Sequence, residues 1–179
     1  MPVNSTRQDY DYQVPIWKKC RDVVEGQERM HLEGETYLPR LSGQSNNDYL
    51  AYVERTLFYN ASQRTVDAMT GLLFRKDPVM TIPTAMESWV EDVDMNGNSI
   101  RAFVEDLADE ILTVGRFGLL IEHPEVQIES EEGQVITQAQ AESQNLRPFF
   151  AKYVAENIVN WKIKVVNNQK ILIQVVLRS

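Results

Sequence analysis

The sequence predicts an α+β fold in which helices come first and strands come last. Hydrophobic residues recur with a helical period in several segments before residue 115, and from residue 147 onward they follow strand patterns. The two kinds of element are separated along the chain, which favours α+β over α/β architecture. With 179 residues, 43% of them hydrophobic, the chain is long enough to bury one core.

We expect three regions along the chain. Residues 1–13 are predicted to form a mobile arm, because the start of the chain is polar and lacks a hydrophobic period. Residues 14–83 are predicted to be helical. Residues 84–179 are predicted to form an α+β region with an acidic helix and a C-terminal hairpin. No apolar run approaches the roughly 18 residues that a membrane span needs, so we expect no membrane partner.

The first helix is predicted to open at Pro15 and to stop at Gly26, because these residue types favour those positions. Its shared side would carry Ile16, Lys19, Cys20 and Val23. Residues 27–45 contain two glycines and one proline without a sustained period. We therefore expect a connecting segment there.

Two stronger helices are predicted next. In the first, Ser45 and Asp48 can cap the start. Its hydrophobic face would consist of Tyr49, Tyr52, Val53, Thr56 and Leu57. The second is expected over residues 62–74, because Pro78 ends the pattern. Its apolar side would consist of Val66, Met69, Leu72 and Leu73.

A strand and another helix are predicted around Pro83. Residues 79–82 suit a short strand, and Thr84 and Glu87 have capping-box spacing for a helix that follows. That helix would carry Met86, Trp89, Val90 and Val93 on its apolar side. Residues 94–99 then form a polar turn.

The most regular helical pattern begins at Ser99 and stops at Gly115. One face carries Ile100, Phe103, Val104, Leu107, Ile111 and Leu112, and the other carries Glu105, Asp106, Asp109 and Glu110. Residues 117–122 are short, apolar and flanked by Gly and Pro, which predicts a buried strand. Residues 123–145 are expected to be a mobile, exposed excursion with one helical turn near residues 138–142.

The end of the sequence has a β pattern. Phe149, Phe150 and Tyr153 suit a strand, and residues 155–160 suit a brief turn or helix. Trp161, Ile163 and Val165 then alternate with lysines, and Ile171, Ile173, Val175 and Leu177 alternate after a turn at Asn167 and Asn168. The chain stops on this last strand without covering its edge, so we expect a fragment of a longer protein.

The charge is negative and concentrated. The net charge is −8, yet residues 87–132 contain 13 acidic residues and only two basic ones, Arg101 and Arg116. Proteins that read DNA sequence carry clustered Lys and Arg to neutralise phosphates. The composition therefore disfavours sequence-specific DNA binding, although a repelling acidic wall is compatible with non-specific passage of a polyanion.

No catalytic, cofactor-binding or metal-binding residue can be assigned, and we expect no enzyme and no cofactor. Cys20, His31 and His123 are too few for a Cys/His zinc site. The Asp94 segment matches a calcium loop poorly, and no phosphate-binding loop or nucleophile elbow is present. The carboxylates at 105, 106, 109 and 110 are a metal or cation patch in one interpretation, and a solvated or subunit-facing helix side in the favoured one.

Five strings resemble, in order and spacing, a family of tailed-bacteriophage portal, or head-to-tail connector, proteins. They are YLPRLSGQS (37–45), LFYNAS (57–62), GLLFRKDP (71–78), GRFGLLIEHP (115–124) and RPFFAKYVAENIVNW (147–161). The resemblance covers about residues 12–177. Family members are longer, so it implies an N-terminal, wing-like part, with the stem and clip mostly beyond residue 179.

The resemblance implies a structural subunit of a ring, typically dodecameric, at one vertex of a virion capsid. Such a ring forms the channel for packaging and ejection of double-stranded DNA, with non-specific passage. Its implied partners are terminase, the major capsid protein, and adaptor or tail proteins, and its implied locations are the virion and, during assembly, the host cytoplasm. The family supplies no motif of functional residues, so the interface remains unassigned.

Two other functions remain open from the residues alone. One is a carboxylate-based, cation-dependent enzyme using the acids of residues 94–110. The other is a small phage host-interaction protein that binds one bacterial partner.

Overall fold

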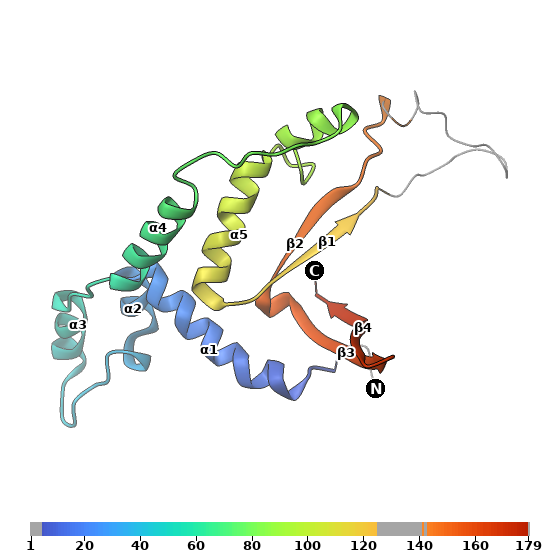
Figure 1. Cartoon of the computed structure of the whole chain (residues 1–179). Helices are drawn as coiled ribbons and strands as arrows, with labels where there is room; N and C mark the ends of the chain where they lie inside the picture. The colour runs from blue at the N-terminus through green and yellow to red at the C-terminus, as the bar shows by residue number, and fades with distance from the viewer. Residues whose placement is uncertain (1–4, 125–140, 142, 179) are drawn as a thin grey trace.

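A computed structural model describes residues 5–124, 141 and 143–178 of the chain. The fold is α+β, as predicted, with helices followed by two antiparallel hairpins (Figure 1). The elements are α1 (Gln8–Glu25), α2 (Gln27–Glu33), η1 (Gly34–Thr36), α3 (Asn46–Arg55), α4 (Ala61–Leu73), η2 (Thr84–Glu91), α5 (Ile100–Val114), β1 (Phe117–Glu122), β2 (Phe149–Val154), η3 (Ala155–Asn157), β3 (Ile158–Val166) and β4 (Gln169–Leu177).

Helix α1 begins at Gln8, so the prediction that it opens at Pro15 is wrong, and residues 8–13 are helical rather than part of an arm. The helix continues through Pro15 because its first half is anchored: Tyr10 is buried and packs edge-to-face on Trp17, with ring centroids 5.9 Å apart. The segment just before α1 is also bonded to β3. The Arg7 backbone N–H donates to the Val159 carbonyl at 3.2 Å.

The segment 27–45 is not only a connection, because α2 and η1 lie in it. Gly26 separates α1 from α2 with φ of 92°, a backbone conformation that glycine adopts without strain. A Cβ at this position would also lie 2.6 Å from the amide nitrogen of Asn60. The tight turn therefore brings α2 back against α1, with Met30 buried.

Helices α3 and α4 both have the side-chain caps that their sequences favour. Ser45 Oγ accepts from the Asp48 backbone N–H at 3.2 Å, as predicted, and Asn60 Oδ1 accepts from the Gln63 N–H at 2.9 Å. Burial is less than expected on α4, where Val66 is buried. The predicted apolar side is mostly exposed, at Met69, Leu72 and Leu73.

The connection from α4 to α5 differs from the prediction. Residues 79–82 have no regular structure rather than forming a strand, and Val79 is 98% exposed. The predicted helix after Pro83 is the 3₁₀ helix η2, without a side-chain cap. Helix α5 is confirmed at both ends: Ser99 Oγ accepts from the Ala102 N–H, and Gly115 ends the helix in the left-handed conformation.

The four strands form two separate two-stranded antiparallel sheets, β1–β2 and β3–β4. Strand β1 is confirmed, but it is not buried, because Leu119 and Ile121 are 50% and 67% exposed. The Asn167–Asn168 turn is confirmed, with both residues at positive φ. A register shift between Lys162 and Ile163 places Leu172 opposite Ile163 and Ile171 opposite Lys164. The predicted alternation along β4 is therefore broken by this irregularity.

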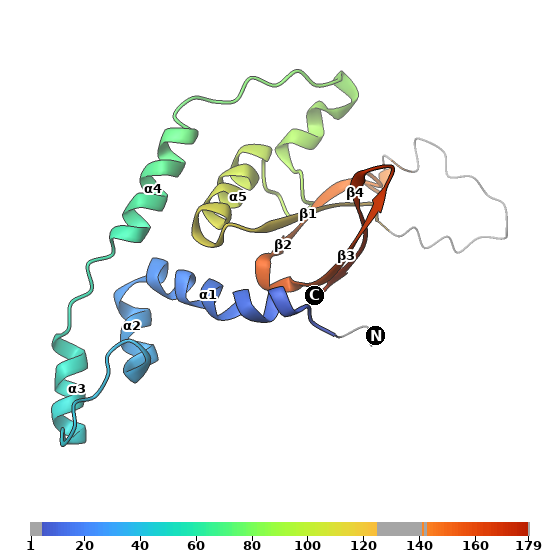
Figure 2. The same cartoon turned by 60° about the horizontal axis from the view of Figure 1, so that its bottom comes forward.

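The core is small and lies where α1 crosses the start of β3. Its buried cluster consists of Tyr10, Trp17, Ala155 and Val159, with Val14, Val114, Trp161 and Val176 packed against it. Figures 1 and 2 show that α3 and α4 extend away from this junction on one side, while the hairpins extend on the other. The shape is consequently open, and many apolar side chains remain in solvent. None of the described helices is long and apolar enough to cross a bilayer.

Candidate functional site

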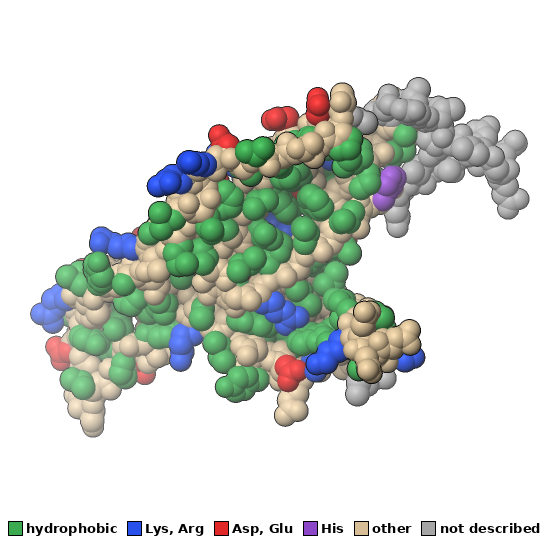
Figure 3. Space-filling view, viewed as in Figure 1, with side chains coloured by type: hydrophobic (Ala, Val, Ile, Leu, Met, Phe, Trp, Pro, Cys, Tyr) green, Lys and Arg blue, Asp and Glu red, His purple; other side chains and the backbone are tan. Residues whose placement is uncertain are grey.

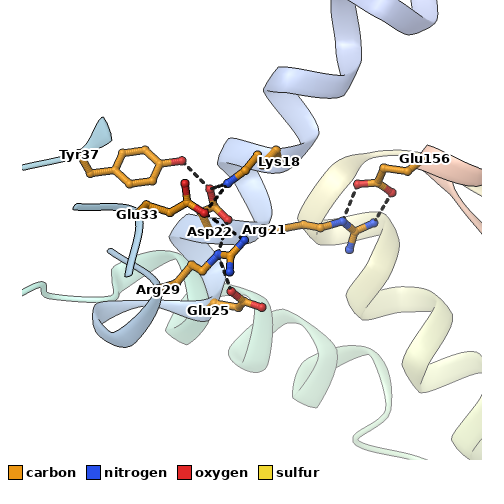
Figure 4. Close-up of polar contacts among 8 residues, drawn as sticks. All are labelled: Lys18, Arg21, Asp22, Glu25, Arg29, Glu33, Tyr37 and Glu156. Atoms are coloured by element: carbon orange, nitrogen blue, oxygen red, sulfur yellow. Dashed lines mark hydrogen bonds and ion pairs between the residues drawn. The ribbon is translucent and has the colours of Figure 1, made fainter. Parts of the chain in front are cut away.

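A buried carboxylate on α1 lies at the centre of a group of polar side chains. Asp22 is 2% exposed, and three side chains donate to it: Lys18 Nζ at 2.6 Å, Tyr37 Oη at 2.7 Å and Arg29 Nε at 2.8 Å. Glu33 adds a second anion near the same two cations, 2.9 Å from Lys18 Nζ. Figure 4 shows these side chains converging from α1, α2 and the segment after η1.

The surroundings of Asp22 keep it ionised. Burial alone would raise its pKa, but the hydrogen bonds from Lys18, Arg29 and Tyr37 outweigh that effect and lower the pKa to about 2. The carboxylate is therefore a poor proton donor or acceptor near neutral pH. Its arrangement is that of a structural anchor that joins α1 to α2.

This pKa predicts an acid-sensitive contribution to stability. A carboxylate whose folded pKa lies below its ordinary value of 3.8 stabilises the fold above that value, and the contribution is lost as the pH falls toward 2. We expect the unfolding free energy of the wild type to fall more steeply between pH 4 and 2 than that of Asp22→Asn. Denaturant titrations at several pH values measure the difference, and parallel curves would contradict it.

A second ionic cluster joins three elements through Arg21. Its guanidinium donates to both carboxylate oxygens of Glu156, at 2.7 and 2.8 Å, and to Glu110 at 2.9 Å. The hydrogen bond from Arg21 lowers the pKa of Glu156, and those to the two glutamates raise the pKa of Arg21. The fork geometry suits two carboxylates and positions α1 against α5 and η3. Figure 4 shows the pair that Arg21 forms with Glu156.

The acidic side of α5 is distributed among different partners rather than gathered round one point. Glu105 pairs with Arg101, Asp106 with Lys152, and Glu110 with Arg21. Asp109 accepts from the Thr70 hydroxyl. Within the described ranges, no group of three or more His, Cys, Asp and Glu side chains could hold a metal ion. These contacts favour the interpretation of the four acids as a structural helix side.

The other residues considered for metal chemistry are also separated. His31 Nε2 lies 2.9 Å from the Thr56 carbonyl oxygen, while His123 is an exposed residue beside Pro124. Asp94 is buried in its own loop, where Asn98 Nδ2 donates to Oδ2 at 2.7 Å and the Asn96 N–H donates to Oδ1 at 3.1 Å. Burial would raise the pKa of Asp94, but these bonds lower it, as expected for the plain turn.

A groove of about 770 Å³ lies among α1, β1 and the β3–β4 hairpin. Among the residues that line it, the Arg116 guanidinium lies over two indole rings, 4.2 Å from the Trp161 ring centroid and 5.5 Å from that of Trp17. Burial lowers the pKa of Arg116. Apolar side chains line the walls, including Leu119 on β1 and Leu172 on β4, which are 50% and 56% exposed.

No protein-family model matches the sequence, and no curated protein sequence matches it. The interpretation of the site therefore depends on the chain's own residues. Its polar clusters are paired, whereas its apolar strands are open to solvent, and exposed apolar surface of this kind is typical of interaction sites.

The exposed apolar surface is spread over several elements. Figure 3 shows hydrophobic side chains gathered over the middle of one face. The members more than half exposed include Leu50, Leu57, Tyr59, Leu72, Leu73, Val79, Ile121, Ile163, Val165, Leu172 and Ile173. The sequence pattern placed most of these residues on predicted helices or strands, but it did not predict that they are exposed. The period identifies the apolar face of an element and does not show whether another element covers that face. The contact of Arg116 with the two indole rings was also missed, since the rings come from residues far apart in the sequence.

Proposed function

We propose that this chain is the wing-like part of a bacteriophage portal subunit, and that its copies assemble into a ring at a capsid vertex. The ring would form the channel for packaging and ejection of double-stranded DNA. Terminase, the major capsid protein, and adaptor or tail proteins would be its partners. The proposal starts from the five sequence strings, in order, that resemble the portal family.

The observation that carries the assembly part of the proposal is the exposed β3–β4 hairpin. Every side chain from residue 162 to residue 175 is exposed, although many of them are large and apolar. A two-stranded hairpin on its own is marginally stable in water and normally needs a further strand or a packing surface. A ring supplies such a surface from the neighbouring subunit.

The charge distribution is consistent with non-specific passage of DNA. The acids of residues 87–132 lie in a part of the chain with only two basic residues. Glu105, Asp106 and Glu110 pair with Arg101, Lys152 and Arg21. Acids of this segment that face a channel without such a partner would repel phosphates and would not retain them. No specific observation favours the cation-dependent enzyme, since the α5 carboxylates already have partners, and calorimetry with Ca²⁺, Mg²⁺ and Mn²⁺ would test it directly.

The decisive experiment is negative-stain imaging combined with light-scattering mass. It uses the purified product of the uninterrupted reading frame that begins at Met1. We expect rings with a central hole and a mass that is a multiple of the subunit mass. A product that stays monomeric under assembly conditions would contradict the proposal. In a pull-down from host lysate, recovery of one host protein in place of capsid components would favour the host-interaction function.

A further inference from the structure

The exposed end of the β3–β4 hairpin is apolar on both faces. Cross-strand partners lie on the same face of a sheet, so Ile163 and Leu172 share one face while Lys164 and Ile171 share the other. The large apolar side chains that are at least 38% exposed here are Ile163, Val165, Val166, Ile171, Leu172, Ile173 and Val175. Neighbouring apolar side chains that are exposed in this way are typical of surfaces that contact a partner.

The hairpin is also basic. Lys162, Lys164 and Lys170 are exposed, and no acidic residue follows Glu156 in the sequence. If two such hairpins paired through the face that carries Lys162 and Lys164, like charges would meet, which is unfavourable. The partner surface should therefore be apolar and acidic.

The segment around η2 has the complementary composition. Between Lys76 and Arg101 there are five acidic residues and no basic one. Glu87 and Glu91 are exposed there. The exposed apolar side chains beside them are Val79, Met80, Ile82 and Met86, at 98%, 41%, 36% and 40%. An apolar cavity of about 290 Å³ opens among Ile82, Met86, Trp89 and the start of β2.

These two surfaces lie on different parts of the molecule. Figure 1 places η2 at the top of the view and the β3–β4 hairpin at the bottom, and Figure 3 shows acidic side chains over the η2 end. A contact between different patches on identical chains is heterologous, and it generates a ring when the rotation closes.

We propose that the hairpin end, residues 162–175, docks on the η2 surface, residues 79–91, of a second copy of this chain. This inference rests on the proposed ring assembly and names the contact that forms it. Lys162 and Lys164 lie against Glu87 and Glu91 of the next copy, and Ile171, which shares their face of the hairpin, covers Val79 and Met86. A nucleic acid would use the lysines but would leave the apolar side chains in water, so a protein surface fits better.

Charge exchange tests this contact in the full reading-frame product. The hairpin variant carries Lys162→Glu and Lys164→Glu, and the η2 variant carries Glu87→Lys and Glu91→Lys. Each variant alone should need about tenfold or more protein for assembly, because like charges then face each other. Mixing the two should restore assembly, since each hairpin then meets an η2 surface of opposite charge. Light-scattering mass measures both effects.

A matched control reverses two exposed acids elsewhere, Glu28→Lys and Glu54→Lys on α2 and α3, and should assemble like the wild type. Circular dichroism confirms that each variant is folded. On a Cys20→Ser background, Val79→Cys copies mixed with Ile171→Cys copies should form an inter-chain disulfide. Predominant pairing of Ile171→Cys copies with one another would overturn the proposal.

The outcomes separate this inference from the proposed function. Wild-type rings together with unaffected rings in both variants would overturn the contact but leave the portal proposal standing. A wild type that stays monomeric would overturn both. Loss of duplex DNA binding in the hairpin variant, without loss of assembly, would assign the lysines to phosphate and overturn the contact.

Discussion

Replacing Trp17 with alanine is expected to lower the free energy of unfolding by about 3–5 kcal/mol, the usual range for truncating a buried aromatic side chain. Trp17 is 5% exposed and belongs to a cluster of buried residues that joins α1 to η3 and β3. Its ring also packs on Tyr10 and faces Arg116. Because this core is small, few other contacts compensate for the cavity. Urea denaturation followed by circular dichroism measures the loss.

Trp161→Ala is the matched comparison. Trp161 packs against the same cluster but is only half-buried, so its truncation should cost less than that of Trp17. Equal losses in the two variants would contradict this order and show that Trp161 contributes as much to the core as Trp17. A fully stable Trp17→Ala variant would contradict the placement of α1 in the core.

Replacing Asp22 with alanine is expected to cost about 2–3 kcal/mol, because charge-assisted hydrogen bonds to a buried carboxylate are lost. Three donors from α1, α2 and the segment after η1 meet at this one side chain. Lys18 and Arg29 are partly exposed and regain water contacts, which keeps the cost below that of a fully buried ion pair. Thermal and denaturant unfolding measure it.

Asp22→Asn separates charge from size. Asparagine keeps the shape and still accepts one hydrogen bond, so its loss of stability should be smaller than that of alanine. Glu25→Gln is the control, because Glu25 pairs with Arg29 while 62% of its side chain is exposed. A control as costly as Asp22→Ala would show that net charge, rather than the buried contacts, sets the stability.

The parts of the fold that were predicted correctly have local causes. Ser45 and Ser99 are side-chain caps, Gly115 ends α5, and Asn167 with Asn168 forms the hairpin turn. Each of these residues acts on backbone groups within a few positions, so the sequence pattern contains the whole interaction. The α+β class follows from the same local patterns.

The parts that were missed depend on distant partners. Helix α1 extends back to Gln8 because Tyr10 packs on Trp17 and donates to the Glu156 carbonyl, which lies 146 positions away. The hydrogen bonds to Asp22 were not predicted, because residues 27–45 were expected to be a connecting segment. Without α2, the pattern gave no position for Arg29 or Tyr37 relative to α1. Strand β1 was predicted to be buried because its residues are apolar, yet the consecutive residues Leu119, Leu120 and Ile121 are exposed, so side chains on both of its faces are open to solvent.

The double role of Asn60 has a consequence for the way the helical part opens. The same side chain caps the first turn of α4 through Oδ1 and donates through Nδ2 to the Val24 carbonyl at the end of α1, at 2.7 Å. Neither helix end can fray without releasing a hydrogen bond of the other. We therefore expect the end of α1, the Gly26 turn and the start of α4 to open as a single cooperative unit in native-state hydrogen exchange.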